Sequence, residues 1–388
     1  MNEKKLVPRR RFEEFQNADA WEQRKIVDIA PLQRGFDLPV SEREAGLYPV
    51  IMSNGIGAYH SKYKAKAPGV VTGRSGTIGN LTFVETDYWP HNTALWVTDF
   101  KDNDAKYIYY LYQKLDLKRY STGSGVPTLN RNDVHDTATS IPSFPEQKKI
   151  SRLFSQLDNL ITLHKRKLEK TKALKSAYLA EMFPAEGERV PKRRFAGFNG
   201  EWKQTRLEEL AEVRTGKAFS SLDFNDDGEY LVITNKNVQD QENDRPLIGD
   251  RINLKNKSII NDYLLNGINV LVTMDGVNIG DTGKIKHGKA VLAQRVGRLN
   301  SDQIEFVYQI TKRNKFTFEM NKVSVGNAIK HISLKQIAEY SFLAPVLKEE
   351  QKAIGEFFKK MDDSIRNQQQ KLKKLKAMKQ AYLAEMFV

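Results

Sequence analysis

The chain has 388 residues and a formal net charge of +14, from 62 Lys and Arg against 48 Asp and Glu. This length fits two or three domains, and the excess of positive charge favours a polyanionic partner, most often nucleic acid. The absence of cysteine excludes disulfides, thiolate metal sites and cysteine catalysis, and the lack of a long apolar stretch or secretory signal predicts a cytoplasmic protein.

The first globular segment, residues 1–141, reads as mixed α and β structure. Short apolar runs at 48–52, 70–72 and 94–98 are typical of strands separated by Gly-rich turns, and 107–117 is typical of a helix. Its turns carry residue types that contact bases and phosphates. We predict DNA contacts there from Arg34, Lys62, Lys64, Arg74, Ser75, His91, Asn92, Arg119 and Arg131. Arg74 is favoured, because its Gly-Arg-Ser-Gly turn allows a close approach of the backbone.

A repeat dominates the rest of the chain. The segments 146–183 and 350–387 align without a gap, and 20 of their 38 residues are identical. The opening VPRRRFEEF at 7–15, followed by Trp21, recurs as VPKRRFAGF at 190–198, followed by Trp202. The two alignments differ in offset, 204 against 183 residues, so the second globular segment carries 21 additional residues (204 − 183).

The repeated segments predict two long helices, at 142–183 and 346–388. In each, ten positions follow an alternating spacing of four and three residues, which is typical of a coiled-coil seam. These positions are Ile150, Phe154, Leu157, Ile161, His164, Leu168, Thr171, Lys175, Tyr178 and Met182, and Ile354, Phe358, Met361, Ile365, Gln368, Leu372, Leu375, Lys379, Tyr382 and Met386.

The matched phase favours pairing of the two helices with each other. A polar residue falls at the same step of both seams, His164 in one and Gln368 in the other. A pseudo-two-fold axis across the pair requires antiparallel helices. The alternative is that each helix packs on its own domain only. We interpret His164 as a residue that sets register rather than as a catalytic base.

A linker of six residues, 184–189, joins the first helix to the second opening motif. The chain starts with six residues before Val7 and ends one residue after Phe387. The chain therefore reads as a circle cut at this joint, with its two ends close together.

The second globular segment, residues 190–345, shares a faint framework with the first. Apolar runs at 230–234, 269–273 and 290–293 are typical of strands, and 306–313 is typical of a helix. The run VTMDGVNIGD at 272–281 resembles VTGRSGTIGN at 71–80. We predict DNA contacts here from Lys217, Lys236, Asn237, Lys286, Arg295, Lys330 and His331.

Catalytic motifs fail on inspection. The Gly55-Ile56-Gly57 run lacks the third glycine and the acidic residue of a dinucleotide site. Gly283-Lys284 lacks the earlier glycine of a phosphate-binding loop. There is no Asn/Asp-Pro-Pro-aromatic run of an adenine methyltransferase, and no HExxH or paired-carboxylate pattern. We therefore expect no catalytic residue, no metal and no cofactor bound by this chain.

The duplicated layout resembles the DNA-specificity subunit of type I restriction–modification enzymes. The resemblance covers the whole chain and rests on the VPxxRF openings, the EQK starts and the AYLAEMF ends of the repeated helices. It implies an α+β fold with two mixed α/β target-recognition domains in tandem, separated by two long antiparallel coiled-coil helices in a pseudo-two-fold, circular organisation. The domains would be 1–141 and 190–345, and the spacer helices 142–183 and 346–388.

The resemblance also implies a function. The chain would read a bipartite, asymmetric target on double-stranded DNA without catalysing a reaction. Two modification subunits, carrying S-adenosylmethionine for adenine N6-methylation, and two restriction subunits would bind to it. Two alternatives come from other classes. One is an RNA-binding module, although this sequence lacks the aromatic RNP-type runs and the KH-type GxxG helix pair of such modules. The other is a coiled-coil scaffold, which leaves the two globular segments unexplained.

Overall fold

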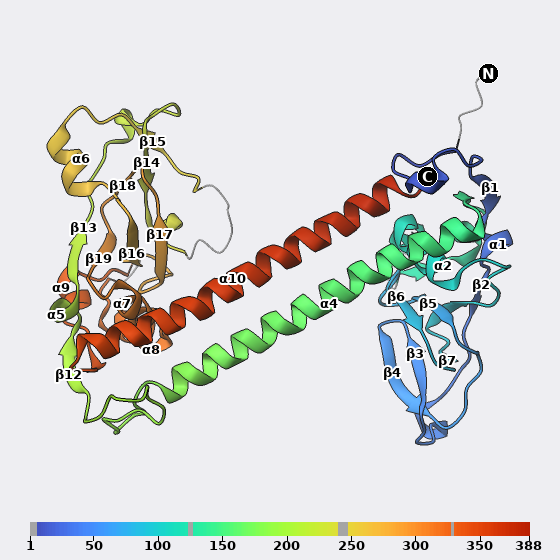
Figure 1. Ribbon diagram of the computed structural model, residues 1–388, viewed down its shortest axis with the longest axis horizontal. Coiled ribbons are helices and arrows are strands. Elements are labelled where there is room, and N and C mark those ends of the chain that lie inside the picture. The colour runs from blue at the N-terminus through green and yellow to red at the C-terminus, as the bar shows by residue number, and fades with distance from the viewer. Residues whose placement is uncertain (1–5, 123–126, 240–246, 327–329) are drawn as a thin grey trace. The chain divides into compact units, whose positions relative to one another are not determined.

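The computed structural model describes residues 6–122, 127–239, 247–326 and 330–388. The chain divides into two compact units, unit 1 with Met1–His164 and Leu372–Val388, and unit 2 with Lys165–Lys371. Each unit combines one globular segment with parts of two long helices, α4 (Phe144–Glu181) and α10 (Lys348–Glu385) (Figure 1).

Unit 1 is built around two small sheets. A four-stranded antiparallel sheet has the order β2-β8-β5-β6, and a three-stranded sheet, β4-β3-β7, contains the parallel pair β3 and β7. Helix α2 covers the four-stranded sheet, where Val70, Leu95 and Tyr107 are buried in one cluster. The elements are β1 (Glu22–Lys25), α1 (Ile26–Ile29), β2 (Leu32–Arg34), β3 (Tyr48–Met52), β4 (Gly55–His60), β5 (Gly69–Gly73), β6 (Leu81–Val84), β7 (Trp89–Pro90), β8 (Ala94–Val97), α2 (Ala105–Leu115), β9 (Ser121–Thr122), β10 (Thr128–Leu129), α3 (Arg131–His135) and β11 (Ala138–Ile141).

Unit 2 repeats this plan. Its four-stranded antiparallel sheet has the order β13-β19-β16-β17, and its three-stranded sheet, β15-β14-β18, contains the parallel pair β14 and β18. Helix α7 packs on the larger sheet, with Phe306 buried against Val270 and Leu299. The elements are β12 (Lys203–Arg206), α5 (Leu207–Leu210), β13 (Glu212–Thr215), β14 (Tyr230–Ile233), β15 (Arg251–Ile252), α6 (Lys257–Tyr263), β16 (Ile268–Thr273), β17 (Thr282–Lys286), β18 (Ala290–Leu292), β19 (Val296–Asn300), α7 (Ile304–Thr311), α8 (Asn314–Val323), α9 (Leu334–Ala338) and β20 (Ser341–Ala344).

The strand registers establish which residues of the two units are equivalent. In unit 1, β5 and β8 pair Gly73 with Ala94, and in unit 2, β16 and β19 pair Thr273 with Val296. The β1–β11 ribbon likewise matches the β12–β20 ribbon. Most of the predicted extra length lies between β14 and β16, where Ile233 and Thr273 are 40 positions apart and the equivalent Ile51 and Gly73 of unit 1 are 22 apart; helix α6 lies in this stretch.

The two long helices run antiparallel. In unit 1 the beginning of α4 packs with the end of α10, and Phe154 lies 5.8 Å from Phe387 between ring centroids. In unit 2 the beginning of α10 packs with the end of α4, and Phe358 lies 6.1 Å from Phe183. All twenty predicted seam positions are buried or half-buried. The alternative in which each helix packs only on its own domain is wrong, because each contributes to both units.

The repeated opening motif anchors each globular segment to the start of a helix. In unit 1 the guanidinium of Arg11 donates two hydrogen bonds of 2.8 Å to the carboxylate of Glu146, whose side chain is 1% exposed. In unit 2 Arg194 donates two of 2.7 Å to Glu350, also 1% exposed. Such paired hydrogen bonds satisfy a buried carboxylate and fix the angle between the two elements.

The repeated AYLAEMF ends place a phenylalanine in each core. Phe387, at the end of α10, stacks on Tyr107 and meets Trp21 edge-on. Phe183, just after α4, stacks on Phe306 and meets Trp202 in the same manner. The repeated sequence at the helix ends therefore attaches each helix to a globular domain.

The two ends of the described chain lie close together, as predicted. The Arg10 N–H donates a hydrogen bond to the Glu385 carbonyl.

Candidate nucleic-acid interface

The loops that follow several strands of unit 1 meet at one end of its sheets, which we call the strand-end edge of unit 1 (residues 34–37, 53–54, 74–76, 91–93 and 127–131). Backbone hydrogen bonds join them: the N–H groups of Arg74 and Ser75 both donate to the Thr93 carbonyl, and the His91 N–H donates to the Ile51 carbonyl. A bridge between Ser75 and Thr128 adds the loop before α3.

Arg74 occupies the centre of this edge, in the turn after β5. A Cβ atom at Gly73 would lie 1.9 Å from the Thr77 carbonyl oxygen, and Gly76 has a φ of +77°, so both glycines are required by the turn. The Arg74 side chain is half-buried and has no hydrogen bond or ion pair within the described part of unit 1. Its guanidinium is therefore available to an added acceptor.

Other predicted residues of unit 1 divide between this edge and the rest of the surface. Arg34, Ser75, His91, Asn92 and Arg131 lie at the edge, and Lys64 borders it, with its Nζ 5.7 Å from the centroid of the Phe36 ring. Lys62 lies elsewhere, because it follows β4 at the opposite end of the smaller sheet. Arg119 lies over the Tyr120 ring in a short 3-10 helix that contacts β10.

Some side chains at this edge are already engaged. The Asn92 amide donates to the Asp37 carboxylate, which also lies 3.9 Å from Arg34. Burial lowers the pKa of His91, and the nearby Arg43 lowers it further. His91 is therefore predominantly neutral at neutral pH and offers hydrogen bonds rather than charge.

The equivalent loops of unit 2 form a second strand-end edge (residues 215–218, 234–236, 274–277, 293–295 and 330–331). The Met274 N–H donates to the Arg295 carbonyl, and the Gly276 N–H donates to the Lys330 carbonyl. Bridges join Lys217 to Ala293 and Asp275 to His331. The edge therefore collects five of the predicted residues: Lys217, Lys236, Arg295, Lys330 and His331.

A polar network lies at the centre of this second edge. The Asp275 carboxylate accepts a hydrogen bond from the Asn235 amide on one oxygen and one of 3.1 Å from Arg295 on the other. The Asp275 side chain is 16% exposed, whereas that of Arg295 is 65% exposed. An oriented guanidinium on a half-buried carboxylate is an arrangement suited to recognising a pair of acceptors.

Two predicted residues of unit 2 do not belong to this edge. Asn237 is 5% exposed, and its amide accepts from the Thr234 N–H and donates to the Ile248 carbonyl, so it stabilises a turn; this burial argues against the predicted contact with DNA. Lys286 pairs with Ile268 at the far end of β16 from Thr273. A residue close to a glycine turn in the sequence can lie at either end of the sheet, so this proximity alone does not identify the residues of the edge.

Residues that sequence reasoning missed supply the framework of both edges. Ser53 and Thr93 in unit 1, and Asn235 and Asp275 in unit 2, carry no positive charge and were not candidates. The register shows that Asp275 is equivalent to Ser75. The gapless alignment of 71–80 with 272–281 instead places Asp275 opposite Arg74, one residue earlier. Because the turn of unit 2 contains one additional residue, the gapless alignment concealed this equivalence.

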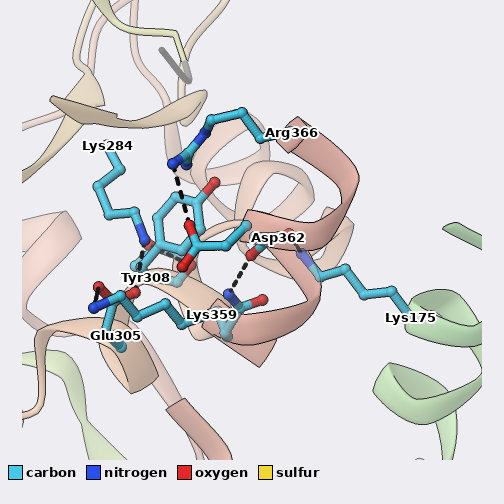
Figure 2. A network of polar contacts seen from close by, with 10 residues as sticks. Lys175, Lys284, Glu305, Tyr308, Lys359, Asp362 and Arg366 are labelled. Atoms are coloured by element: carbon cyan, nitrogen blue, oxygen red, sulfur yellow. Dashed lines mark hydrogen bonds and ion pairs between the residues drawn. The ribbon is translucent and has the colours of Figure 1, made fainter. Parts of the chain in front are cut away.

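A second polar region joins the globular part of unit 2 to its helices (Figure 2). Lys284 on β17 forms an ion pair of 2.6 Å with Glu305 on α7, and its Nζ lies 4.6 Å from the centroid of the Tyr308 ring. Lys359 of α10 lies 3.8 Å from the same carboxylate. Next to it, Asp362 pairs with Lys175 of α4 at 2.6 Å. These contacts attach the sheet to both helices within one unit.

Within the described ranges, no group of three or more His, Asp or Glu residues is placed to hold a metal ion. Of the described helices, none is long and apolar enough to cross a membrane.

The sequence profile of the type I restriction modification DNA specificity domain matches residues 18–173 and again residues 199–377. The chain belongs to this family. The two matches fall one on each repeat, so the specificity domain is duplicated, and the DNA-specificity resemblance deduced from the repeats is confirmed.

Known relatives agree with this assignment. The type I restriction enzyme MjaVIII specificity subunit of Methanocaldococcus jannaschii is 25% identical over 296 residues, covering 70% of this chain and 68% of the relative. The crystal structure of the S subunit of a type I restriction-modification system from M. genitalium matches with a TM-score of 0.72 at 14% identity, over 99% of both chains. The latter supports the fold of this specificity-family member, with its tandem domains and paired helices.

Proposed function

We propose that the chain reads a bipartite, asymmetric target on double-stranded DNA, with one half-site bound at each strand-end edge. The observation that carries this proposal is that the two units share one backbone framework but present different side chains on it. Equivalent loops present Arg34, Arg74 and Arg131 in unit 1, and Lys217, Lys236 and Arg295 in unit 2. Because each set is different, the two half-sites differ in sequence. The net charge of +14 supplies attraction to the phosphates.

The long helices fix the distance between the half-sites in this proposal. Each helix has 38 residues, corresponding to about 57 Å at 1.5 Å per residue, and each contributes to both units. A reader with two modules on a rigid spacer selects half-sites at a set separation. The gap between half-sites is then a property of the protein.

The chain acts as a non-catalytic subunit in the cytoplasm and positions other subunits. Two modification subunits, which bind S-adenosylmethionine, methylate adenines at N6 within the target, and two restriction subunits join them. The support is the family membership together with the absence of a methyltransferase motif from the sequence. Base flipping by the modification subunits gives the target adenine access to the cofactor.

The test is to reconstitute the full chain with its modification subunit and S-adenosylmethionine. We expect methylation of duplex DNA at one bipartite sequence, read by methylome sequencing, and no methyl transfer by the chain alone. Methyl transfer by the purified chain, or preferential binding of RNA over duplex DNA across a salt series, would contradict the proposal.

A further inference from the structure

We propose that Arg295 reads a guanine of the second half-site, and that Asp275 and Asn235 are positioning residues that hold its guanidinium group. This inference rests on the proposed function and adds to it a specific residue and a specific base. All three residues lie within unit 2: Arg295 directly precedes β19, and Asp275 and Asn235 follow β16 and β14.

The backbone of Arg295 is the first observation. Arg295 has a φ of +65°, in the left-handed region, and is one of only four non-glycine residues with positive φ in the described chain. A glycine would adopt this conformation without cost, so the presence of a long charged side chain here points to a use for the side chain. Its carbonyl accepts a hydrogen bond from the Met274 N–H at 3.2 Å, which holds the residue against the neighbouring loop.

The side chain is the second observation. Arg295 Nη1 donates to Asp275 at 3.1 Å, and no other hydrogen bond of its guanidinium occurs within the described part of the unit. Asp275 also accepts from Asn235, so both of its oxygens are occupied. One corner of the guanidinium is therefore fixed while its remaining donors face outward on a side chain that is 65% exposed. An oriented fork of N–H donors matches O6 and N7 of guanine in the major groove.

The comparison with unit 1 is the third observation. The positions equivalent to Asn235, Asp275 and Arg295 are held by Ser53, Ser75 and Thr93, as the strand registers define them. In unit 1 the Ser53 N–H donates to the Thr93 hydroxyl, and the short side chains end close to the backbone. The same three backbone positions thus carry an acid–guanidinium–amide set in one unit and three hydroxyl groups in the other, as expected for positions that select the base.

A phosphate oxygen is the competing acceptor for this guanidinium. The half-buried carboxylate favours the base, because it orients the donors, whereas a phosphate contact requires charge alone and is weakened by a neighbouring acid. The two acceptors also differ in measurable ways: a base contact changes discrimination at one base pair, and a phosphate contact changes affinity for every sequence and the salt dependence.

The test uses the complete complex with its modification subunits and a panel of duplexes in which each base pair of the methylome-defined target is changed in turn. The main variant is Arg295→Gly, which removes the guanidinium and suits the left-handed backbone, so it retains the fold. We expect discrimination at one G·C pair of the second half-site to fall by about 10- to 100-fold, with the first half-site unchanged. Arg295→Lys retains the charge but not the fork, and we expect it to lose the same discrimination. Asp275→Asn should cause a smaller loss at the same base pair.

The matched control is Arg206→Ala, an arginine of the same unit that is 58% exposed, is paired with Glu208 and lies away from the edge on β12. It should leave every preference intact. A uniform loss of affinity in Arg295→Gly, with the salt slope reduced by about one, would assign the residue to a phosphate and overturn the inference. Unchanged discrimination would do the same. If the unaltered complex showed no sequence preference, the proposed function itself would fail.

Discussion

The junctions between the globular parts and the helices differ between the two units although their frameworks match. In unit 1, a cavity of about 820 Å³ opens beside Phe83 on β6 and Lys106 on α2, and the Lys106 Nζ lies 3.7 Å from the Phe83 ring centroid. At the equivalent positions unit 2 has Lys284 and Glu305, which form an ion pair that Lys359 joins (Figure 2). Phe83 and Lys284 are equivalent because they pair with Val70 and Val270. Lys106 and Glu305 are equivalent because each precedes the ring, Tyr107 or Phe306, that stacks on the phenylalanine of a helix end.

This comparison separates the parts of the specificity domain that keep the framework from those that vary. The opening motif makes matching buried contacts with the helix starts in both units, Arg11 with Glu146 and Arg194 with Glu350. The phenylalanines at the helix ends, Phe387 and Phe183, are buried in matching cores. The junction and the strand-end edges change their chemistry on that framework. Substitutions at the duplicated contacts should therefore destabilise the two units equally, whereas substitutions at the varied contacts should destabilise them by different amounts.

The largest effect is expected from the phenylalanines at the helix ends. Phe183 follows α4 but packs in unit 2 against Phe306, Phe358 and Trp202. Phe183→Ala should destabilise unit 2 by about 3–5 kcal/mol, because a buried ring is lost and a cavity remains. Hydrogen exchange resolved by peptide should show lost protection in 190–345 rather than in 1–141. Phe387→Ala should give the reverse pattern.

The control is Phe318→Ala, whose ring is 67% exposed in the same unit. It should leave protection in both units unchanged. Equal loss of protection in both globular segments after Phe183→Ala would show that the two units do not unfold separately.

The next largest effect is expected from the buried ion pairs. Glu350→Gln leaves the Arg194 guanidinium, 14% exposed, without its charged partner and should cost about 3 kcal/mol. Glu146→Gln should destabilise unit 1 by a similar amount. Urea denaturation monitored by hydrogen exchange in each globular segment measures both costs. Arg206→Ala removes an exposed pair and should cost less than 1 kcal/mol. A difference of more than about 2 kcal/mol between the two Glu→Gln variants would contradict the equivalence of the anchors.

A smaller effect, and an unequal one, is expected at the junctions. Glu305→Gln removes the carboxylate that Lys284 and Lys359 share and should destabilise unit 2 by about 2 kcal/mol. Lys106→Met in unit 1 removes a cation–π contact and an ion pair of 3.5 Å with the exposed Glu85, and should cost about 0.5–1 kcal/mol. Equal costs in the two units would show that the chemical difference between the junctions has no energetic consequence.

The sequence was sufficient for the framework but not for the edges. Periodicity located α4 and α10, and apolar runs located strands such as β3 at Tyr48–Met52 within a residue. Local pattern does not report which end of a strand a turn occupies, so it groups Lys286 with residues that lie at the other end of the sheet. It also does not report burial, so it predicts a DNA contact for Asn237 although this residue is buried and closes a turn. Asp275 was missed because a positioning acid carries the opposite charge to a DNA contact.

The smallest effect concerns pH and one unit only. In unit 1 the His135 Nε2 accepts a hydrogen bond of 2.8 Å from the Leu32 N–H, which requires the neutral ring. Burial lowers the pKa of His135 from 6.5, with a further contribution from the charge of Arg131. The equivalent position in unit 2 is Ala338, at the end of α9, which does not titrate.

A histidine whose pKa is lower in the folded state binds fewer protons when folded than when unfolded. Its contribution to stability is therefore complete above pH 6.5, the unfolded value, and decreases as the pH falls from there through the lower folded value. Exchange protection of 1–141 should consequently fall between pH 7.5 and pH 5.5 more than that of 190–345. His135→Ala should remove this difference while lowering the stability of unit 1 at pH 7.5 by about 1 kcal/mol, through the lost hydrogen bond to Leu32. If the variant retained the same pH dependence, another group of unit 1 would be responsible, and His91, whose pKa burial also lowers, is the next to substitute.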